Sequence, residues 1–133
     1  MNNCIFCDIV AGNIPAWIIY QNAEVISFLP GTMEAYGHTL IVPKAHYTDI
    51  YSIPAPLLAA TVITAQKLSV HYQSRIGSTG INLLHASGVA AQQSVFHFHL
   101  HLIPRFANDG LNAWPKLSSS VFNKDEIWDK LKF

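Results

Sequence analysis

The segment from His97 to Ile103 alternates a histidine with an apolar residue, and it constrains this chain more than any other part of its sequence. Alternation with a period of two is typical of a β-strand, in which successive side chains point to opposite faces of a sheet. The pattern places three imidazoles on one face, about 7 Å apart, and Phe98, Leu100 and Leu102 on the other. Three imidazoles buried without partners would be costly, so we expect this face to bind a ligand or to carry chemistry.

Four other segments are short and strand-like, and those before residue 43 are rich in β-branched and aromatic side chains between proline, glycine or asparagine. The predicted strands are 17–21, 25–29, 39–42, 80–85 and 95–103. Between the third and the fourth, the apolar period changes to three and four residues, which predicts an amphipathic helix over about 56–75 that ends near Gly77. Its apolar stripe comprises Leu58, Val62, Ala65, Ser69, Tyr72 and Ile76.

The order of the predicted elements, β-β-β-α-β-β, indicates the fold class. No helix separates the last two strands, so they can pair only through a loop, which suits an antiparallel sheet. We therefore predict an α+β fold in which a five-stranded antiparallel sheet carries one long helix on a face, with short terminal helices. Asn123 and Glu126 have the spacing of a capping box and place a tail helix at 124–132.

No linker or repeat divides the chain, so we treat 1–133 as a single domain with a core over 4–105 and a tail over 106–133. Eight Lys and Arg balance eight Asp and Glu, which argues against a nucleic acid polymer or a membrane surface as partner. Such neutrality favours self-association. No apolar stretch is long enough to span a membrane, and the segment from Met1 to Cys4 lacks the features of a secretory signal, so we expect a soluble, cytoplasmic protein.

The histidine row allows two functional interpretations. In the first, His97 and His99, or His99 and His101, chelate one catalytic metal that lowers the pKa of a bound water. In the second, one imidazole is a nucleophile and its neighbours serve other purposes.

Cys4 and Cys7 form a C-x-x-C element, which is too short to tie distant parts of the chain together. A framework of disulfides is thus excluded, and metal binding or redox chemistry remains as the role of the two cysteines. A closed zinc site would need two more nitrogen or sulfur ligands, for which one histidine of the row and one from elsewhere, such as His46, would suffice.

The segment His97–Ile103 resembles the H-φ-H-φ-H-φ-φ signature of the histidine-triad superfamily of nucleotide hydrolases and transferases. Trp114-Pro115 resembles the tail of the branch that hydrolyses nucleoside phosphoramidates. Further landmarks of the family follow in the right order: Cys4–Cys7, Ile14-Pro15, Gly37-His38, Ile41–Lys44 with His46, Gln93–Val95 and Ile103–Arg105.

The resemblance implies catalytic roles for His99, His101 and His38. His99 corresponds to the family's nucleophile, which attacks the α-phosphorus and forms a nucleotidyl-histidine while a backbone carbonyl holds its other nitrogen. His101 and Ser94 match positions that contact the phosphate, Gln93 matches one near the leaving group, and His38 matches a histidine that lines the site.

The resemblance also implies one structural zinc per chain, held by Cys4, Cys7, His46 and His97, and a homodimer. The expected partner is a purine nucleotide or a nucleotide conjugate. His71 and His85 have no counterpart in the family, and we interpret them as solvated or structurally satisfied histidines.

Three positions depart from the family pattern. Pro30 replaces an Asp that binds the ribose hydroxyls, Ala86-Ser87 replace a pair with at least one Asn, and Gln92 replaces a Gly. Proline cannot accept the hydrogen bonds that a carboxylate accepts, so the nucleoside side is altered while the phosphate side is intact. The resemblance implies a hydrolase or transferase acting at the α-phosphate of a nucleoside phosphoramidate or a dinucleoside polyphosphate. The alternative is a nucleotide-binding module without catalysis.

Overall fold

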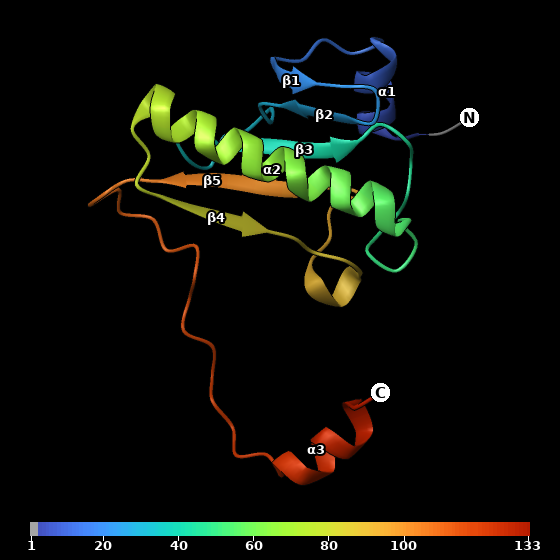
Figure 1. The fold of residues 1–133 in the computed structure, drawn as a ribbon, viewed down its shortest axis with the longest axis vertical. Coiled ribbons are helices and arrows are strands. Elements are labelled where there is room, and N and C mark those ends of the chain that lie inside the picture. Colours follow the sequence, from blue (N-terminus) through green and yellow to red (C-terminus); the bar gives the residue numbers. More distant parts are fainter. Residues whose placement is uncertain (1–2) are drawn as a thin grey trace.

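The computed structural model describes residues 3–133, and one antiparallel sheet organises them (Figure 1). Residues 1–2, which belong to the segment interpreted above as lacking a secretory signal, lie outside the described residues. The strand order is β1-β2-β3-β5-β4, so the predicted α+β class is confirmed. The elements are α1 (Ile5–Ala11), β1 (Ile18–Gln21), β2 (Val25–Phe28), β3 (Thr39–Pro43), α2 (Ala55–Ile76), β4 (Gly80–Leu84), η1 (Val89–Ala91), β5 (Leu100–Arg105) and α3 (Lys124–Leu131).

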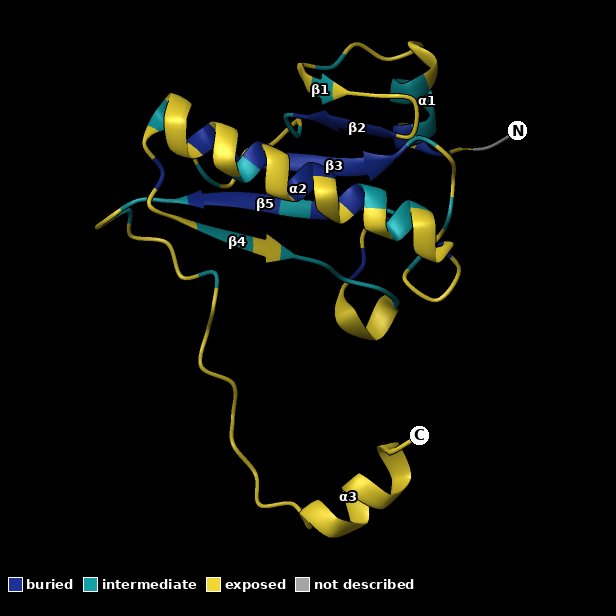
Figure 2. Cartoon of the chain, viewed as in Figure 1, coloured by how far each residue is buried: buried dark blue, intermediate teal, exposed yellow. Residues whose placement is uncertain are grey.

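Apolar side chains cover both faces of the central strands, since β2 and β3 are buried along their whole length (Figure 2). Alternate residues enter different cores: Val25 and Ile41 face α2, whereas Ile26 and Val42 face α1. The short helix α1 is held on the second face by Phe6, which is 5% exposed. Burial of one such ring stabilises the fold by about 1.5–3 kcal/mol.

The buried stripe of α2 differs from the predicted one. Thr61 and Thr64 are buried, whereas Val62, which belongs to the predicted stripe, is 46% exposed. The two threonine hydroxyls donate to the carbonyls of Leu57 and Ala60, one helical turn earlier, so their polar atoms are satisfied inside the core. Leu58 and Ile76 of the predicted stripe are partly buried and pack against the core. The fully buried residues of α2 are Thr61, Thr64, Ala65, Leu68 and Tyr72.

The histidine strand begins at Leu100 rather than at residue 95 as predicted, and it extends to Arg105. Its ladder with β3 stops at the pair Ile41 and Leu100, and upstream the Phe98 N–H donates to the carbonyl of Tyr47 at 2.6 Å. Residues 95–99 are therefore not part of the sheet, and Phe98 is hydrogen-bonded instead to the loop that contains Tyr47. The alternation of side chains still holds, because Phe98 lies in the core on the α2 side.

The tail leaves the sheet at Arg105, whose guanidinium donates two hydrogen bonds of 2.8 Å to the Asp109 carboxylate. It then runs away from the sheet to α3, which is exposed throughout (Figures 1 and 2). The predicted cap is confirmed, since Asn123 accepts a hydrogen bond from the Glu126 N–H at 3.1 Å. Among residues 3–133, no helix has the length and apolar character needed to cross a membrane.

Candidate functional site

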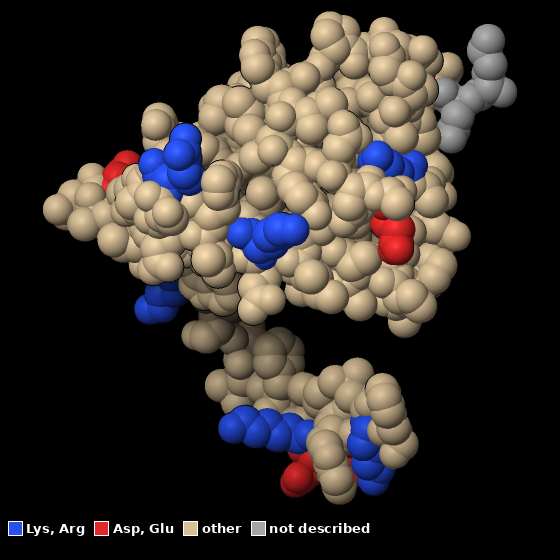
Figure 3. All heavy atoms as spheres, turned by 45° about the horizontal axis from the view of Figure 1, so that its top comes forward, with Lys and Arg blue, Asp and Glu red and all other residues tan. Residues whose placement is uncertain are grey.

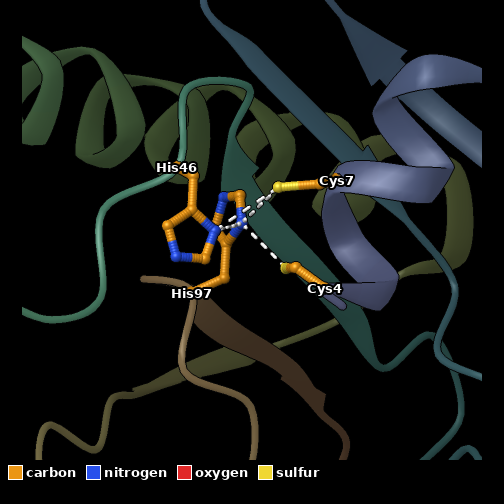
Figure 4. A group of neighbouring side chains, drawn as sticks. All are labelled: Cys4, Cys7, His46 and His97. Atoms are coloured by element: carbon orange, nitrogen blue, oxygen red, sulfur yellow. Dashed lines mark hydrogen bonds between the residues drawn. The ribbon is translucent and has the colours of Figure 1, made fainter. Parts of the chain in front are cut away.

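Two thiols and two imidazoles from three parts of the chain converge on one point (Figure 4). Cys4 and Cys7 come from the start of α1, His46 follows β3, and His97 precedes β5. The Cys4 Sγ lies 3.4 Å from the His97 Nδ1, and the Cys7 Sγ lies 3.4 Å from the His46 Nδ1. The two Nδ1 atoms are 3.1 Å apart, and all four ligand atoms lie within 4.8 Å of one another.

The hydrogen bonds of His97 leave the lone pair of one ring nitrogen facing the thiols. Its Nε2–H donates to the carbonyl of Pro43 at 2.8 Å, so Nδ1 carries the lone pair that faces the thiols. Burial lowers the pKa of His97, which keeps the ring neutral. Burial and the neighbouring Cys4 thiol raise the pKa of Cys7 to about 11, so without a cation beside it this thiol is protonated near neutral pH.

The donor set fits a tetrahedral zinc ion. Zinc bonds of about 2.3 Å to sulfur and 2.0–2.1 Å to nitrogen require separations of roughly 3.6 Å between sulfur and nitrogen and roughly 3.3 Å between two nitrogens. The observed separations of 3.4, 3.6 and 3.1 Å agree with these values. The four residues predicted as zinc ligands are therefore brought together, and they would fill all four positions of a closed site.

His99 lies next to this cluster, but its imidazole is held differently. Its Nδ1–H donates to the carbonyl of His97 at 2.7 Å, which leaves the Nε2 lone pair unused by that bond. The ring is 6% exposed and packs edge-on against Phe6 at 5.1 Å. Burial lowers the pKa of His99, so the ring is neutral and nucleophilic near neutral pH.

His38 and His101 form a directed pair. The Glu34 N–H donates to the His38 Nδ1 at 3.3 Å, so the proton of a neutral His38 lies on Nε2. This Nε2–H donates to the His101 Nδ1 at 2.9 Å, which leaves the His101 proton on its Nε2. Burial lowers the pKa of both rings, in keeping with neutral tautomers. His101 thus presents an N–H donor beside the His99 ring, whose centroid is 5.0 Å away.

The other predicted substrate contacts lie in less direct positions. Gln93 is buried, and its amide accepts from the Gly88 N–H and donates to the carbonyls of Thr48 and Val95, so it holds its own loop together. Ser94 is exposed and lines a cavity of about 470 Å³ beside the metal cluster. Pro30 is half-buried just after β2. Their contacts with a substrate stay predictions.

The backbone of the loop between β4 and β5 is strained at Gln92. This residue has a φ of 68°, in the left-handed region that glycine adopts readily, and it closes the short turn η1. A side chain in this conformation costs roughly 1–2 kcal/mol. A glycine at this position would remove that strain.

The three histidines of the row have different partners. Within residues 3–133, the only group of three or more metal-ligating side chains consists of Cys4, Cys7, His46 and His97. His97 faces the thiols, whereas His99 and His101 take a carbonyl and another imidazole as partners. Within the row, His97 thus faces the cluster of thiols, and His99 and His101 do not hydrogen-bond to it.

Sequence reasoning assigned no functional role to His85, which the structure places against the His99 backbone. Both of its ring nitrogens are hydrogen-bonded, to the His99 carbonyl and to the Ser87 hydroxyl, so the prediction of a satisfied histidine is confirmed. His71, on α2, is exposed as predicted. The sequence contains one indication of this contact. His85 directly follows a predicted strand, and that strand is expected to pair with the histidine strand.

Comparison with known proteins gives a consistent result. The sequence profile of the HIT domain family matches residues 11–108. A HIT family protein from Bacillus anthracis is 35% identical, and its structure superposes with a TM-score of 0.86 over 97% of this chain and 92% of that chain. A Zn-bound histidine triad family protein from Mycobacterium smegmatis is 32% identical, with a TM-score of 0.80 over 87% of this chain and 84% of that chain. The adenylylsulfatase HINT3 of Arabidopsis thaliana is 36% identical over 94% of this chain and 64% of that protein.

Proposed function

Because the chain belongs to the HIT domain family, we propose that it hydrolyses or transfers a nucleotidyl group at the α-phosphate of a nucleotide conjugate. The substrate class that we favour is a nucleoside phosphoramidate or a dinucleoside polyphosphate. An adenylyl sulfate is a third candidate, since one relative is named as an adenylylsulfatase. The reaction passes through a covalent nucleotidyl-His99.

The observation that carries this proposal is the hydrogen bond from the His99 Nδ1–H to the His97 carbonyl. A histidine nucleophile needs one nitrogen held by an acceptor so that the other presents its lone pair to the substrate. The hydrogen bond of 2.7 Å meets this requirement, and its acceptor is the carbonyl only two residues before His99. The lowered pKa of the ring adds to it, because a protonated imidazole has no lone pair with which to attack.

The proposed reaction has two displacements. In the first, the His99 Nε2 attacks the α-phosphorus, a P–N bond forms, and the leaving group departs with the electrons of its bond to phosphorus and takes a proton from water. The His101 Nε2–H donates a hydrogen bond to a phosphoryl oxygen and stabilises its charge. In the second, water attacks the phosphorus and gives its proton to the hydroxide left by the first displacement, the P–N bond breaks with its electrons returning to Nε2, and the nucleotide leaves as His99 returns to its neutral form.

We propose that the cluster of Cys4, Cys7, His46 and His97 binds one structural zinc per chain. With two thiolate and two imidazole ligands, the ion would have no open position for water, so its contribution is to hold α1 against the segment that carries His99. The four residues then position the nucleophile and take no part in the two displacements. Loss of the metal would act first on folding.

We also propose a purine nucleotide partner, a homodimer and a cytoplasmic location for this single domain. The sparse charges on the surface support a small partner rather than a nucleic acid polymer (Figure 3). The exposed apolar side chains of the tail, such as Trp128 at 62%, support contact with a second copy. The thiol state of Cys4 and Cys7 suits a reducing compartment.

The test is turnover of adenosine 5′-phosphoramidate, diadenosine polyphosphates and adenylyl sulfate by the purified protein, with His99→Ala as the inactive variant. His71→Phe is the matched control, because it replaces an exposed histidine on α2 that lies outside the site. We expect at least one substrate class to be cleaved by the wild type and the control but not by His99→Ala.

Two outcomes would contradict the proposal. Tight AMP binding with no turnover of any of the three classes would favour the nucleotide-binding module. Full turnover in His99→Ala would show that another group performs the attack.

A further inference from the structure

His85 connects the segment of the proposed nucleophile to two loops of the site. It follows β4 directly, and its half-buried ring packs against Phe98 with centroids 4.5 Å apart. Its Nδ1 lies 2.9 Å from the carbonyl oxygen of His99, and its Nε2 lies 2.6 Å from the Ser87 Oγ. The Ser87 Oγ in turn accepts the Ile50 N–H at 2.9 Å.

The direction of each hydrogen bond follows from chemistry. A carbonyl can only accept, so the His85 Nδ1 carries the proton, and in the tautomer protonated at Nδ1 alone the Nε2 accepts. The Ser87 hydroxyl supplies that proton while its oxygen accepts the N–H of Ile50. The chain therefore runs without conflict from Ile50 through Ser87 and His85 to the His99 carbonyl.

This contact lies where the sheet stops supporting the segment. The ladder between β4 and β5 ends at the pair Leu84 and His101, and the ladder between β3 and β5 ends at Leu100. His99 is one residue beyond, and it is buried. The side chain of His85 donates to the His99 carbonyl, which would be hydrogen-bonded by a neighbouring strand if the sheet continued. This hydrogen bond avoids the cost of a buried, unpaired acceptor.

We propose that His85 is a positioning residue for His99, which fixes the backbone that carries the nucleophile and couples it to the loops that contain Ser87 and Ile50. This inference rests on the proposed function. His85 contacts no reacting atom, so its effect is on the orientation of the His99 imidazole. Because a displacement of about 1 Å at a reacting group can cost roughly 100-fold in rate, we expect the loss to fall on kcat rather than on KM.

Three variants separate the two hydrogen bonds of His85. His85→Phe keeps the ring against Phe98 and removes both bonds. His85→Asn places an amide N–H near the position of Nδ1 and keeps the bond to His99. His85→Gln reaches the position of Nε2 and keeps the contact with Ser87, and His71→Phe controls for the loss of a histidine outside the site.

We expect His85→Phe and His85→Gln to lower kcat by about 10- to 100-fold with KM changed less than about twofold. His85→Asn should recover most of kcat, and His71→Phe should match the wild type. A role in stability alone would lower the melting temperature of the variants and leave kcat of the folded protein unchanged. Equal values of kcat in His85→Asn and His85→Phe, or a wild-type kcat in His85→Phe, would overturn the proposal.

A readout that needs no turnover separates this inference from the proposed function. In ¹⁵N imidazole NMR spectra of the wild type, His85 and His99 should each show a single tautomer protonated at Nδ1. His85→Phe should broaden or split the His99 signal, and His85→Asn should restore it. An unchanged His99 signal in His85→Phe would overturn the positioning role even where the wild type has no activity towards the substrates tested.

Discussion

His97 and His99 are two residues apart in one segment, and the structure connects their imidazoles in opposite ways. His97 donates its Nε2–H to the Pro43 carbonyl and directs Nδ1 at two thiols. His99 donates its Nδ1–H to the His97 carbonyl and leaves Nε2 unused by that bond. The carbonyl partner thus decides which nitrogen of each ring keeps a lone pair, Nδ1 of His97 towards the thiols and Nε2 of His99 away from that bond.

Replacement of the nucleophile should have the largest effect. His99→Ala removes the covalent step and should lower kcat by at least about 10³-fold, while nucleotide binding, zinc content and melting temperature stay close to those of the wild type. Steady-state kinetics, a nucleotide-binding titration, elemental analysis and thermal unfolding check the four expectations. Loss of zinc in this variant would show that the two sites are not separate.

Cys4→Ala should give the reverse pattern. Removal of one ligand of a closed zinc site should lower the free energy of unfolding by about 3 kcal/mol or more and reduce the zinc content. The kcat of the protein that remains folded should change less than its stability. Chelation of the wild type should reproduce the shift in melting temperature, and a metal-free protein with normal stability would contradict the zinc assignment.

His38→Phe tests the directed pair within the histidine site. The variant removes the donor that fixes the proton of His101 on its Nε2, so kcat should fall by about 10- to 100-fold with zinc content unchanged. His38→Gln offers an amide N–H near the position of the lost Nε2–H and should recover part of the rate. Equal activity of the two variants would argue against a role for this hydrogen bond.

Substitution of Pro30 should have the smallest effect. This residue belongs neither to the cluster of thiols and imidazoles nor to the group of His38, His99 and His101. Without a carboxylate for the ribose hydroxyls, the wild type should discriminate adenosine from 2′-deoxyadenosine phosphoramidate by less than about tenfold in kcat/KM, or about 1.4 kcal/mol. Pro30→Asp should widen the ratio without changing zinc content. A ribo preference far above tenfold in the wild type would show that another acceptor, such as the exposed Glu34, binds the hydroxyls.

Features set by neighbouring residues could be predicted from the sequence. The alternation after His97 separates the imidazoles from Phe98, and the spacing of Asn123 and Glu126 gives the observed cap. The order of elements follows from the change of apolar period before and after α2. These signals are local, because each depends on the geometry of one strand or one helix.

Features set by distant contacts could not be predicted. The start of β5 depends on where its partners β3 and β4 stop, and the burial of Thr61 depends on the face of α2 that meets the sheet. The role of His85 needs both the register of β4 and the position of Ser87. A single sequence gives the residue types but not these pairings.

The most direct test of the account is to trap the intermediate on His99. The wild-type protein is mixed with a substoichiometric amount of a nucleotide conjugate that it turns over, and the mixture is quenched at alkaline pH and digested. The peptide that contains His99 should then carry a nucleotidyl adduct. The adduct should be labile in acid and absent from His99→Ala, as expected of a P–N bond. Turnover with no adduct at any quench time, together with undiminished activity in His99→Ala, would contradict the account.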